Sequence, residues 1–195
     1  MLDDGGYYFL YSTSADPTVL GGAIQGHVSA TGSNVISTDG IDFSWERLDG
    51  SLTTLSASLD AQSGLAGTVT YDTVPGRNFS FTSVYRPATN ELVSLAEMAG
   101  RFVSTDGTMR LDIAASGAIS GTAFSSTCGF TGSVTQTQNY TTIMNMSITF
   151  LGGTCSFGTS TIKGLALYNS ASREIIGIAV NDERSRTALF QANKR

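Results

Sequence analysis

Apolar and polar residues alternate along much of the chain. In the segment 144–150, Met, Met, Ile and Phe occupy the even positions, while Asn, Ser and Thr occupy the odd ones. The same period of two recurs in 53–60 and in 109–113. This is the period of a β-strand with one buried and one solvated face, and such strands favour antiparallel pairing over a helix-covered parallel sheet. The pattern therefore predicts an all-β protein.

Turn signals divide the second half of the chain into strands. Asp-Gly and Gly-Gly pairs interrupt the alternation at short intervals, as at 106–107 and 152–153. The strands expected between such turns cover 100–105, 108–115, 118–126, 129–137, 140–151, 160–169, 174–181 and 186–193. Eight antiparallel strands in sequential order are enough to close a small barrel whose interior is filled by side chains. We expect residues 100–195 to form an up-and-down, calycin-like eight-stranded barrel.

The first half of the chain repeats part of this order. Gly-Ala-Ile-Gln-Gly at 22–26 returns about 95 residues later as Gly-Ala-Ile-Ser-Gly at 117–121, and a strand-like segment precedes each copy. Self-similarity at a fixed spacing predicts an internal duplication. We expect residues 1–86 to form a shorter, related β module that lacks its first strand. Divergence of the repeat, or a chance match in a chain with 22 glycines, is the alternative.

A short helix is predicted between the two halves. Leu and Ala follow helical spacing within 92–99, Ser94 and Glu97 have the spacing of a capping box, and Gly100 is a natural C-terminal stop. The connector 87–99 can therefore hold one or two helical turns. We expect it to close one end of the barrel or to join two sheets, and an interaction helix is the weaker alternative.

Composition narrows the classes of partner and location. Charged residues make up 14% of the chain, against about 25% in typical soluble domains, and Ser and Thr together make up about a quarter. The net charge is −5, and the eleven basic residues are scattered along the sequence, which argues against nucleic acid as a partner. No apolar run is long enough for a transmembrane segment. The first residues lack the features of a signal peptide, so we expect a mature region from which the signal peptide has been removed.

Two cysteines indicate the compartment. Cys128 and Cys155 have no CxxC spacing, and the only histidine, His27, is distant in sequence, so neither a metal site nor a redox site is expected. We expect a disulfide in preference to two buried free thiols. Because disulfides persist in oxidising compartments, the pair predicts an extracytoplasmic protein that is periplasmic, anchored to the outer membrane or secreted.

Catalytic chemistry finds little support in the sequence. A Ser-His-Asp arrangement would have to use His27, and a lone histidine in a polar strand is more often structural. A pair of glycosidase-like carboxylates could occur among Asp39, Asp42, Glu46 and Asp49, but these acids lie beside Asp-Gly turns, where Asp is expected for backbone reasons. We expect no catalytic residue, no metal and no cofactor, and keep a carbohydrate-acting enzyme as a distant alternative.

A ligand-binding group is predicted around the single tryptophan. Trp45 could stack on a ligand while Asp42 and Arg47 form hydrogen bonds with it. The alternative is that Trp45 covers the end of a barrel core.

Short motifs carry a resemblance to a family. Leu-Ala-Glu-Met-Ala-Gly-Arg-Phe at 95–102 precedes the Gly-Ala-Ile-Ser-Gly strand, and Cys128, Phe130 and Gly132 follow it. The segment 80–195 resembles uncharacterised bacterial cell-envelope lipoproteins with a cysteine pair, and the overall architecture is similar to that of two-barrel surface lipoproteins. The resemblance implies a lipid anchor upstream of residue 1. The Gly-x-Trp start of lipocalins is absent.

Two functions of different class are consistent with these features. The first is a non-catalytic bacterial envelope or surface protein that binds a protein or glycan partner for adhesion, inhibition or assembly. The second is a carrier of a small hydrophobic ligand inside the C-terminal barrel. The carrier needs a hollow interior. A packed core would exclude it, and we expect such a core to contain Met144, Met146, Ile148, Phe150, Ile176, Ile178 and Val180.

Overall fold

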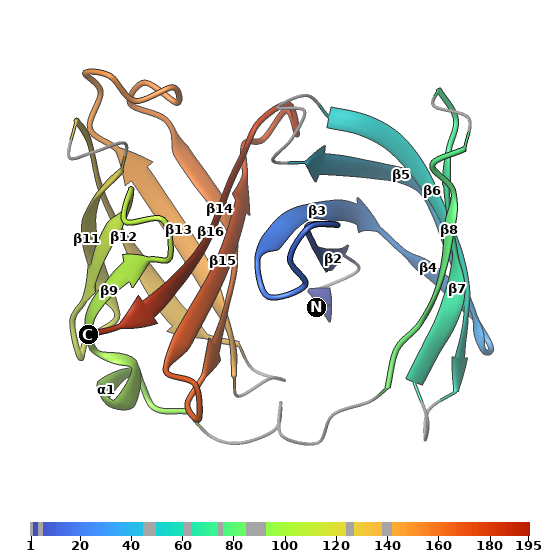
Figure 1. Cartoon of the computed structure of the whole chain (residues 1–195), viewed down its shortest axis with the longest axis horizontal. Coiled ribbons are helices and arrows are strands. Elements are labelled where there is room, and N and C mark those ends of the chain that lie inside the picture. Colours follow the sequence, from blue (N-terminus) through green and yellow to red (C-terminus); the bar gives the residue numbers. More distant parts are fainter. Residues whose placement is uncertain are drawn as a thin grey trace. The chain divides into compact units, whose positions relative to one another are not determined.

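The chain forms two compact units in the computed structural model, Met1–Arg86 (unit 1) and Pro87–Arg195 (unit 2). The structure describes residues 2–3, 6–44, 50–60, 64–73, 76–84, 93–123, 127–137 and 142–195. Antiparallel strands dominate both units, and one short helix lies in unit 2 (Figure 1). The all-β fold class predicted from the alternation is therefore confirmed.

Unit 1 is an open, curled sheet with the strand order β1-β2-β3-β5-β6-β7-β8, and β4 pairs with β5 beside this path. All described pairings in it are antiparallel. The strands are β1 (Leu2–Asp3), β2 (Gly6–Ser12), β3 (Leu20–His27), β4 (Ser29–Thr31), β5 (Asn34–Ser44), β6 (Gly50–Asp60), β7 (Gly64–Tyr71) and β8 (Phe79–Thr82).

One face of the unit 1 sheet lines its core. Alternate residues of five strands form a buried cluster, as the period of two requires. Its members are Tyr7, Ile24, Val35, Leu55, Ala57, Val69 and Tyr71. The curl brings β2 close to β8, because the ring of Phe9 lies 5.6 Å from that of Phe79 and 4.9 Å from that of Phe81. Aromatic packing thus joins two strands that are not neighbours in the sheet.

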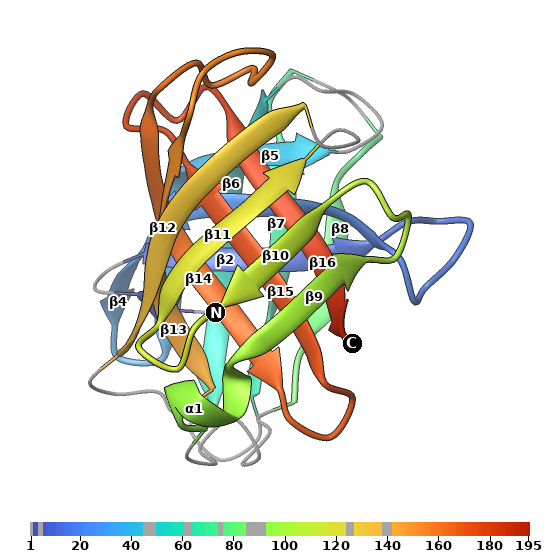
Figure 2. The ribbon, with the colours of Figure 1, turned by 90° about the vertical axis from the view of Figure 1, so that its left-hand side faces the viewer.

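Unit 2 is a closed barrel of eight antiparallel strands in sequential order. The last strand pairs with the first, with Ala192 opposite Ser104 and Lys194 opposite Phe102. Figure 2 looks onto the outside of β9 to β12. The strands are β9 (Gly100–Ser104), β10 (Arg110–Ile113), β11 (Ala118–Ala123), β12 (Cys128–Gln136), β13 (Ile143–Phe150), β14 (Thr161–Asn169), β15 (Glu174–Val180) and β16 (Thr187–Lys194). Each strand predicted in this half is present, and so is the predicted barrel.

Side chains fill the inside of the barrel. Met144, Met146, Ile148 and Phe150 join one buried cluster with residues from every strand of the barrel, as predicted. The expectation for β15 was wrong. Ile175 and Ala179 belong to this cluster, whereas Ile176, Ile178 and Val180 lie on the opposite face of the strand.

The two ends of the barrel are closed differently. At one end lies α1 (Leu95–Met98), where the hydroxyl of Ser94 accepts a hydrogen bond from the backbone N–H of Glu97, as the predicted capping box requires. Met98 is fully buried in the barrel core. Toward the other end the ring of Phe157 stacks on that of Phe150 at 4.7 Å, and a disulfide joins Cys128 to Cys155. The predicted disulfide is therefore present in the structure.

Within the described part of the chain, no helix is long and apolar enough to cross a membrane.

Candidate functional site

Of the three residues predicted to bind a ligand, only Asp42 falls in the described structure. Trp45 and Arg47 lie outside the described residues. Asp42 lies near the end of β5 and is 1% exposed. Its carboxylate accepts hydrogen bonds from the hydroxyls of Tyr11 at 2.6 Å and Tyr71 at 2.8 Å. The side chain is therefore buried and held by other residues of unit 1.

A cation completes this network. The guanidinium of Arg77 lies 3.5 Å from the Asp42 carboxylate and 4.5 Å from the centre of the Tyr71 ring. Burying a carboxylate is costly unless it is paired and hydrogen-bonded, and here two phenols and one guanidinium supply those partners. The arrangement holds a charge in place, and we interpret it as a structural network inside unit 1.

The first residue of the repeated Gly-Ala-Ile segment, Gly22, leaves space for one of the tyrosines of this network. Gly22 lies opposite Tyr11 in the pairing of β2 with β3. A Cβ atom on residue 22 would lie only 2.2 Å from the Tyr11 hydroxyl oxygen, which is closer than any real contact. Glycine at this position therefore leaves room for the tyrosine that binds Asp42.

His27 and Asp39 form an exposed pair on β3 and β5. The His27 Nδ1 lies 2.7 Å from Asp39 Oδ2, and Ser37 Oγ donates to Asp39 Oδ1 at 3.2 Å. In a catalytic triad the histidine lies between the serine and the carboxylate. Here the carboxylate lies between the other two, so this set lacks the geometry of a serine nucleophile activated by histidine. Glu46 and Asp49, the other carboxylates considered with Asp39 and Asp42, lie outside the described residues.

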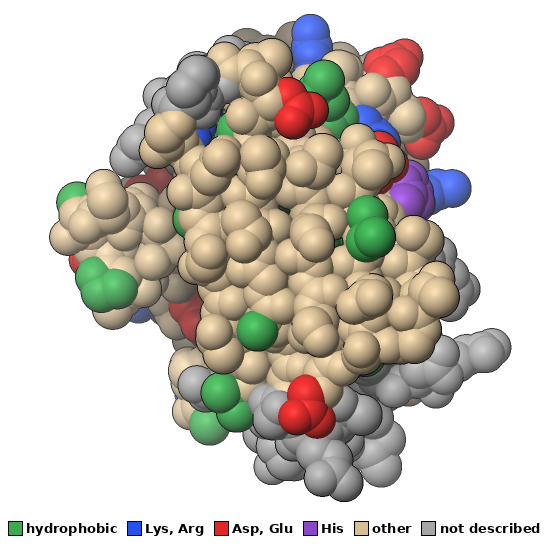
Figure 3. Space-filling view, turned by 90° about the vertical axis from the view of Figure 1, so that its right-hand side faces the viewer, with side chains coloured by type: hydrophobic (Ala, Val, Ile, Leu, Met, Phe, Trp, Pro, Cys, Tyr) green, Lys and Arg blue, Asp and Glu red, His purple; other side chains and the backbone are tan. Residues whose placement is uncertain are grey.

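Hydroxyl side chains cover the outer face of β5 to β8 in unit 1. Directly paired positions carry Ile36, Ser56, Thr68 and Ser80 in one row across four strands. Thr54, Ser58, Thr70 and Thr82 flank this row on the same face. We call these eight residues the hydroxyl face. Figure 3 shows this side of unit 1 as a broad surface with few hydrophobic side chains and with charges near its rim.

A second row of polar side chains crosses the outside of the barrel. Strand pairing places one outward residue of each of six strands in register. The row, called the polar row below, consists of Arg101, Asp112, Ser120, Thr131, Thr149 and Thr161. Neighbouring strands are about 4.8 Å apart, so the row is about 24 Å long. Its two last hydroxyls are 2.8 Å apart.

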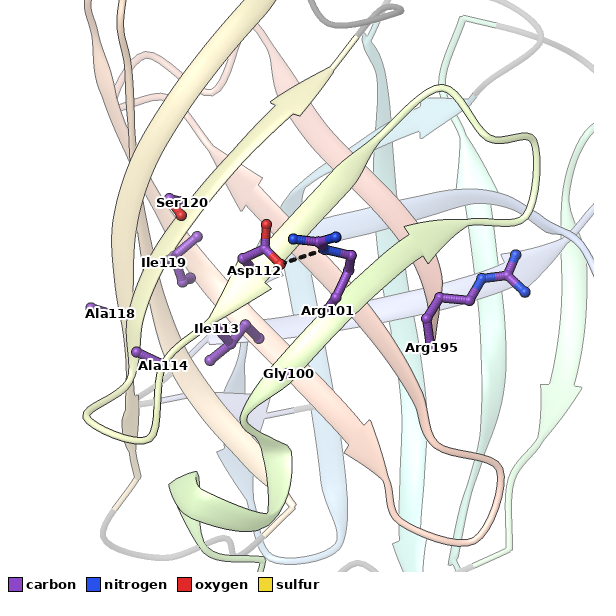
Figure 4. Close-up of a pocket in the computed structure, with 9 residues that line it drawn as sticks. All are labelled: Gly100, Arg101, Asp112, Ile113, Ala114, Ala118, Ile119, Ser120 and Arg195. Carbon is purple, nitrogen blue, oxygen red and sulfur yellow. Dashed lines mark hydrogen bonds and ion pairs between the residues drawn. The ribbon is translucent and has the colours of Figure 1, made fainter.

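An open groove lies at the charged end of the polar row (Figure 4). Arg101 and Asp112 form one wall, with the Arg101 Nε donating to Asp112 Oδ1 at 2.8 Å. The exposed Ala114 and Ala118 supply apolar lining, and Arg195 lies across β9 from Asp112. The Arg101 guanidinium, by its hydrogen bond and its charge, holds the pKa of the Asp112 carboxyl below its usual range. Asp112 is therefore ionised at neutral pH.

Sequence reasoning missed this cluster of charges. The basic residues are scattered in the sequence, but pairing of β9 with β10 and β16 gathers Arg101, Arg110 and Arg195 on one side of the barrel. The alternation of polar and apolar residues in 100–104 could have indicated that Arg101 points outward. The neighbours of Arg101 follow only from barrel closure.

Among the residues that the structure describes, no group of three or more His, Cys, Asp or Glu side chains is placed to hold a metal ion. Comparisons with known proteins add no identity: no family model, no curated protein and no solved structure matches the chain.

Proposed function

We propose that this protein is a non-catalytic, extracytoplasmic binding protein that attaches to a glycan-bearing surface through its hydroxyl-rich outer sheet faces. Of the roles expected from the sequence, adhesion fits this surface best. The observation that carries the proposal is the hydroxyl face of unit 1.

The chemistry of the hydroxyl face favours a glycan over a protein. The cores of protein interfaces are enriched in aromatic residues, Met and Arg, and binding energy concentrates on Trp, Tyr and Arg. The hydroxyl face contains none of these types, and its one large apolar residue is Ile36. Each Ser or Thr hydroxyl is both a donor and an acceptor, which suits the many hydroxyls of a sugar polymer. Individually weak contacts repeated along a polymer add up to useful avidity.

The carrier alternative is less consistent with the barrel. A small hydrophobic ligand needs an enclosed pocket of about 300 Å³ or more. Met144, Met146 and Ile148 meet in a continuous core, with Met98 of α1 packed into the same cluster. The filled interior therefore argues for binding on the outside of the barrel.

The extracytoplasmic location rests on the Cys128–Cys155 disulfide. Disulfides of this structural kind persist mainly outside the reducing cytosol. A bacterial envelope origin, the lipoprotein family and a lipid anchor upstream of residue 1 stay predictions from the sequence.

The proposal is tested by retention on immobilised polysaccharides, both neutral and acidic. We expect wild-type protein to be retained and the double variant Ser56→Glu/Thr68→Glu to lose about tenfold in affinity, because two carboxylates in the centre of the face would repel and displace sugar hydroxyls. Ser14→Glu/Thr31→Glu adds the same charge at exposed positions outside the face and should behave as wild type. Equal retention of both variants, or no retention of any polysaccharide by the wild type, would contradict the proposal.

A further inference from the structure

The groove at the end of the polar row carries an excess of positive charge. Asp112 is the acidic residue among its lining residues, and it is shared by two arginines, with Arg101 Nε at 2.8 Å and Arg110 Nε at 3.4 Å. Among the described residues, no acidic side chain lies within ion-pair distance of Arg195, which also lines the groove. One carboxylate side chain is therefore shared by two guanidinium groups, and a third guanidinium, that of Arg195, lies across β9 (Figure 4).

The guanidinium of Arg101 is accessible from solvent. The Arg101 side chain is 52% exposed, and its described contact with Asp112 uses Nε alone. A guanidinium has five N–H donors, so the terminal amino groups of Arg101 remain to hold an oxyanion in the two-pronged geometry that arginine favours. Figure 4 shows Arg101 and Asp112 side by side, with Ser120 on the neighbouring strand.

We propose that this groove binds the carboxylate or sulfate group of an acidic polysaccharide. Arg101 holds the anion in competition with Asp112, Arg195 adds positive charge on the other side of β9, and Ser120 and Thr131 of the polar row hydrogen-bond the hydroxyls of neighbouring sugars. The proposal rests on the proposed function, since it assigns a chemical class to the glycan.

The spacing of charge selects this class of polyanion. Nucleic acids carry a phosphate on every nucleotide and need a continuous basic track. Beyond the groove, the polar row carries only hydroxyls from Ser120 to Thr161. An acidic polysaccharide combines charged groups with uncharged hydroxyl-bearing sugars, and the row combines a charged end with a run of hydroxyls.

The proposal predicts that substitutions of Arg101 and of Asp112, which form one ion pair, change the affinity for the anion in opposite directions. Removing the charge of Arg101 or Arg195 weakens anion binding, whereas Asp112→Asn removes the competing carboxylate and strengthens it. Lys163 provides a matched control, because it is an exposed cation facing outward on β14 of the same barrel, away from the groove.

The experiment is a calorimetric titration of the whole protein with uronate oligosaccharides, dextran sulfate oligomers and uncharged dextran. We expect an acidic probe to bind, Arg101→Gln and Arg195→Gln each to weaken it about tenfold, Asp112→Asn to tighten it about threefold, and Lys163→Gln to leave it unchanged. Whether the uronate or the sulfated probe binds more tightly identifies the anionic group.

Other outcomes separate the two proposals. Equal weakening by Lys163→Gln would show general charge attraction and overturn the site. Tighter binding of a single-stranded oligonucleotide or of polyglutamate would overturn the assigned class. If uncharged dextran binds as well as the acidic probes and Arg101→Gln has no effect, the groove proposal fails while glycan binding stands. If folded protein binds none of the carbohydrates, the proposed function itself fails.

Discussion

Asp42 is a buried charged residue in the interior of unit 1. Its carboxylate is 1% exposed and accepts two tyrosine hydroxyls beside the Arg77 guanidinium. Removing one member of a buried charge network leaves the others without partners, which costs several kcal/mol. We therefore interpret Asp42 as a structural residue, whereas the sequence predicted a ligand contact beside Trp45.

We predict that Asp42→Ala lowers the free energy of unfolding of unit 1 by about 3 kcal/mol, because two phenol hydroxyls and a guanidinium lose their shared acceptor. Chemical denaturation followed by tyrosine fluorescence measures the change. Asp72→Asn, at an exposed position in the same unit, serves as the control and should stay within about 0.5 kcal/mol of wild type. A loss of similar size in both variants would show that the network has no special role.

Two carboxyls of unit 2 give a pH dependence to stability. A hydrogen bond from the Ser104 hydroxyl lowers the pKa of Asp106, and the Arg101 guanidinium lowers the pKa of Asp112. A carboxyl whose folded-state pKa is lowered stabilises the fold above its unfolded pKa, near about 4, and loses that effect as the pH falls through the folded value. We predict that stability declines below about pH 4. Asp106→Asn/Asp112→Asn should show a shallower decline between about pH 4 and 2, and an unchanged slope would refute the assignment.

Among the elements, β8 has an unusual position. In the described structure it pairs with β7 and with no further strand, so it forms an edge of the unit 1 sheet. Natural edge strands are commonly protected by charges, by proline or by a bulge. The sequence Phe-Ser-Phe-Thr contains neither charge nor proline, and its register with β7 is regular.

We predict a difference in amide exchange along β8. The N–H of Ser83 donates to the carbonyl of Leu65, so in an antiparallel ladder Phe79 and Phe81 also face β7, while the N–H groups of Ser80 and Thr82 face the open edge. Hydrogen exchange followed by NMR should give protection about tenfold or more higher at Phe79 and Phe81. Equal protection at all four residues would mean that the edge is covered.

The disulfide links β12 to the segment after β13. The two cysteines are 27 residues apart in the sequence. In the chain-entropy model, a disulfide that closes a loop of this length stabilises the folded protein by about 3 kcal/mol. We predict that Cys128→Ala/Cys155→Ala loses about this amount in chemical denaturation. Reduction of the wild-type protein should have a similar effect, and full stability under reducing conditions would contradict the role.

The strands were largely predictable from sequence because each barrel strand has one apolar and one polar face. Strand β13 shows this clearly. Its apolar residues occupy the even positions from 144 to 150, and its polar residues occupy the odd positions from 145 to 149. The inward face of β15 could not be read in the same way. Ile175, Ile176 and Ile178 place apolar side chains on both faces, so the parity that points inward depends on pairing with β14 and β16.

At the scale of the whole molecule, the distribution of charge could not be predicted from the order of residues. Unit 1 contains nine acidic and three basic residues, whereas unit 2 contains seven acidic and eight basic ones. The groove arises because β16 returns to β9, which brings Arg195 beside Arg101 through a backbone hydrogen bond of 2.8 Å. Barrel closure pairs strands that are distant in the sequence, so short sequence motifs do not predict which residues it brings together.

The filled barrel and the polar outer faces together support our proposal that the protein binds its ligand on its outer surface. The most direct test is an NMR titration of isotope-labelled protein with uronate oligosaccharides, followed through backbone amide shifts. We predict saturable shifts on the hydroxyl face, at Ser56 and Thr68 among others, and in the groove at Arg101, Asp112 and Ser120. Shifts centred on the interior residues Met144, Met146 and Ile148 would instead show that the barrel encloses its ligand and would contradict binding on the outer surface.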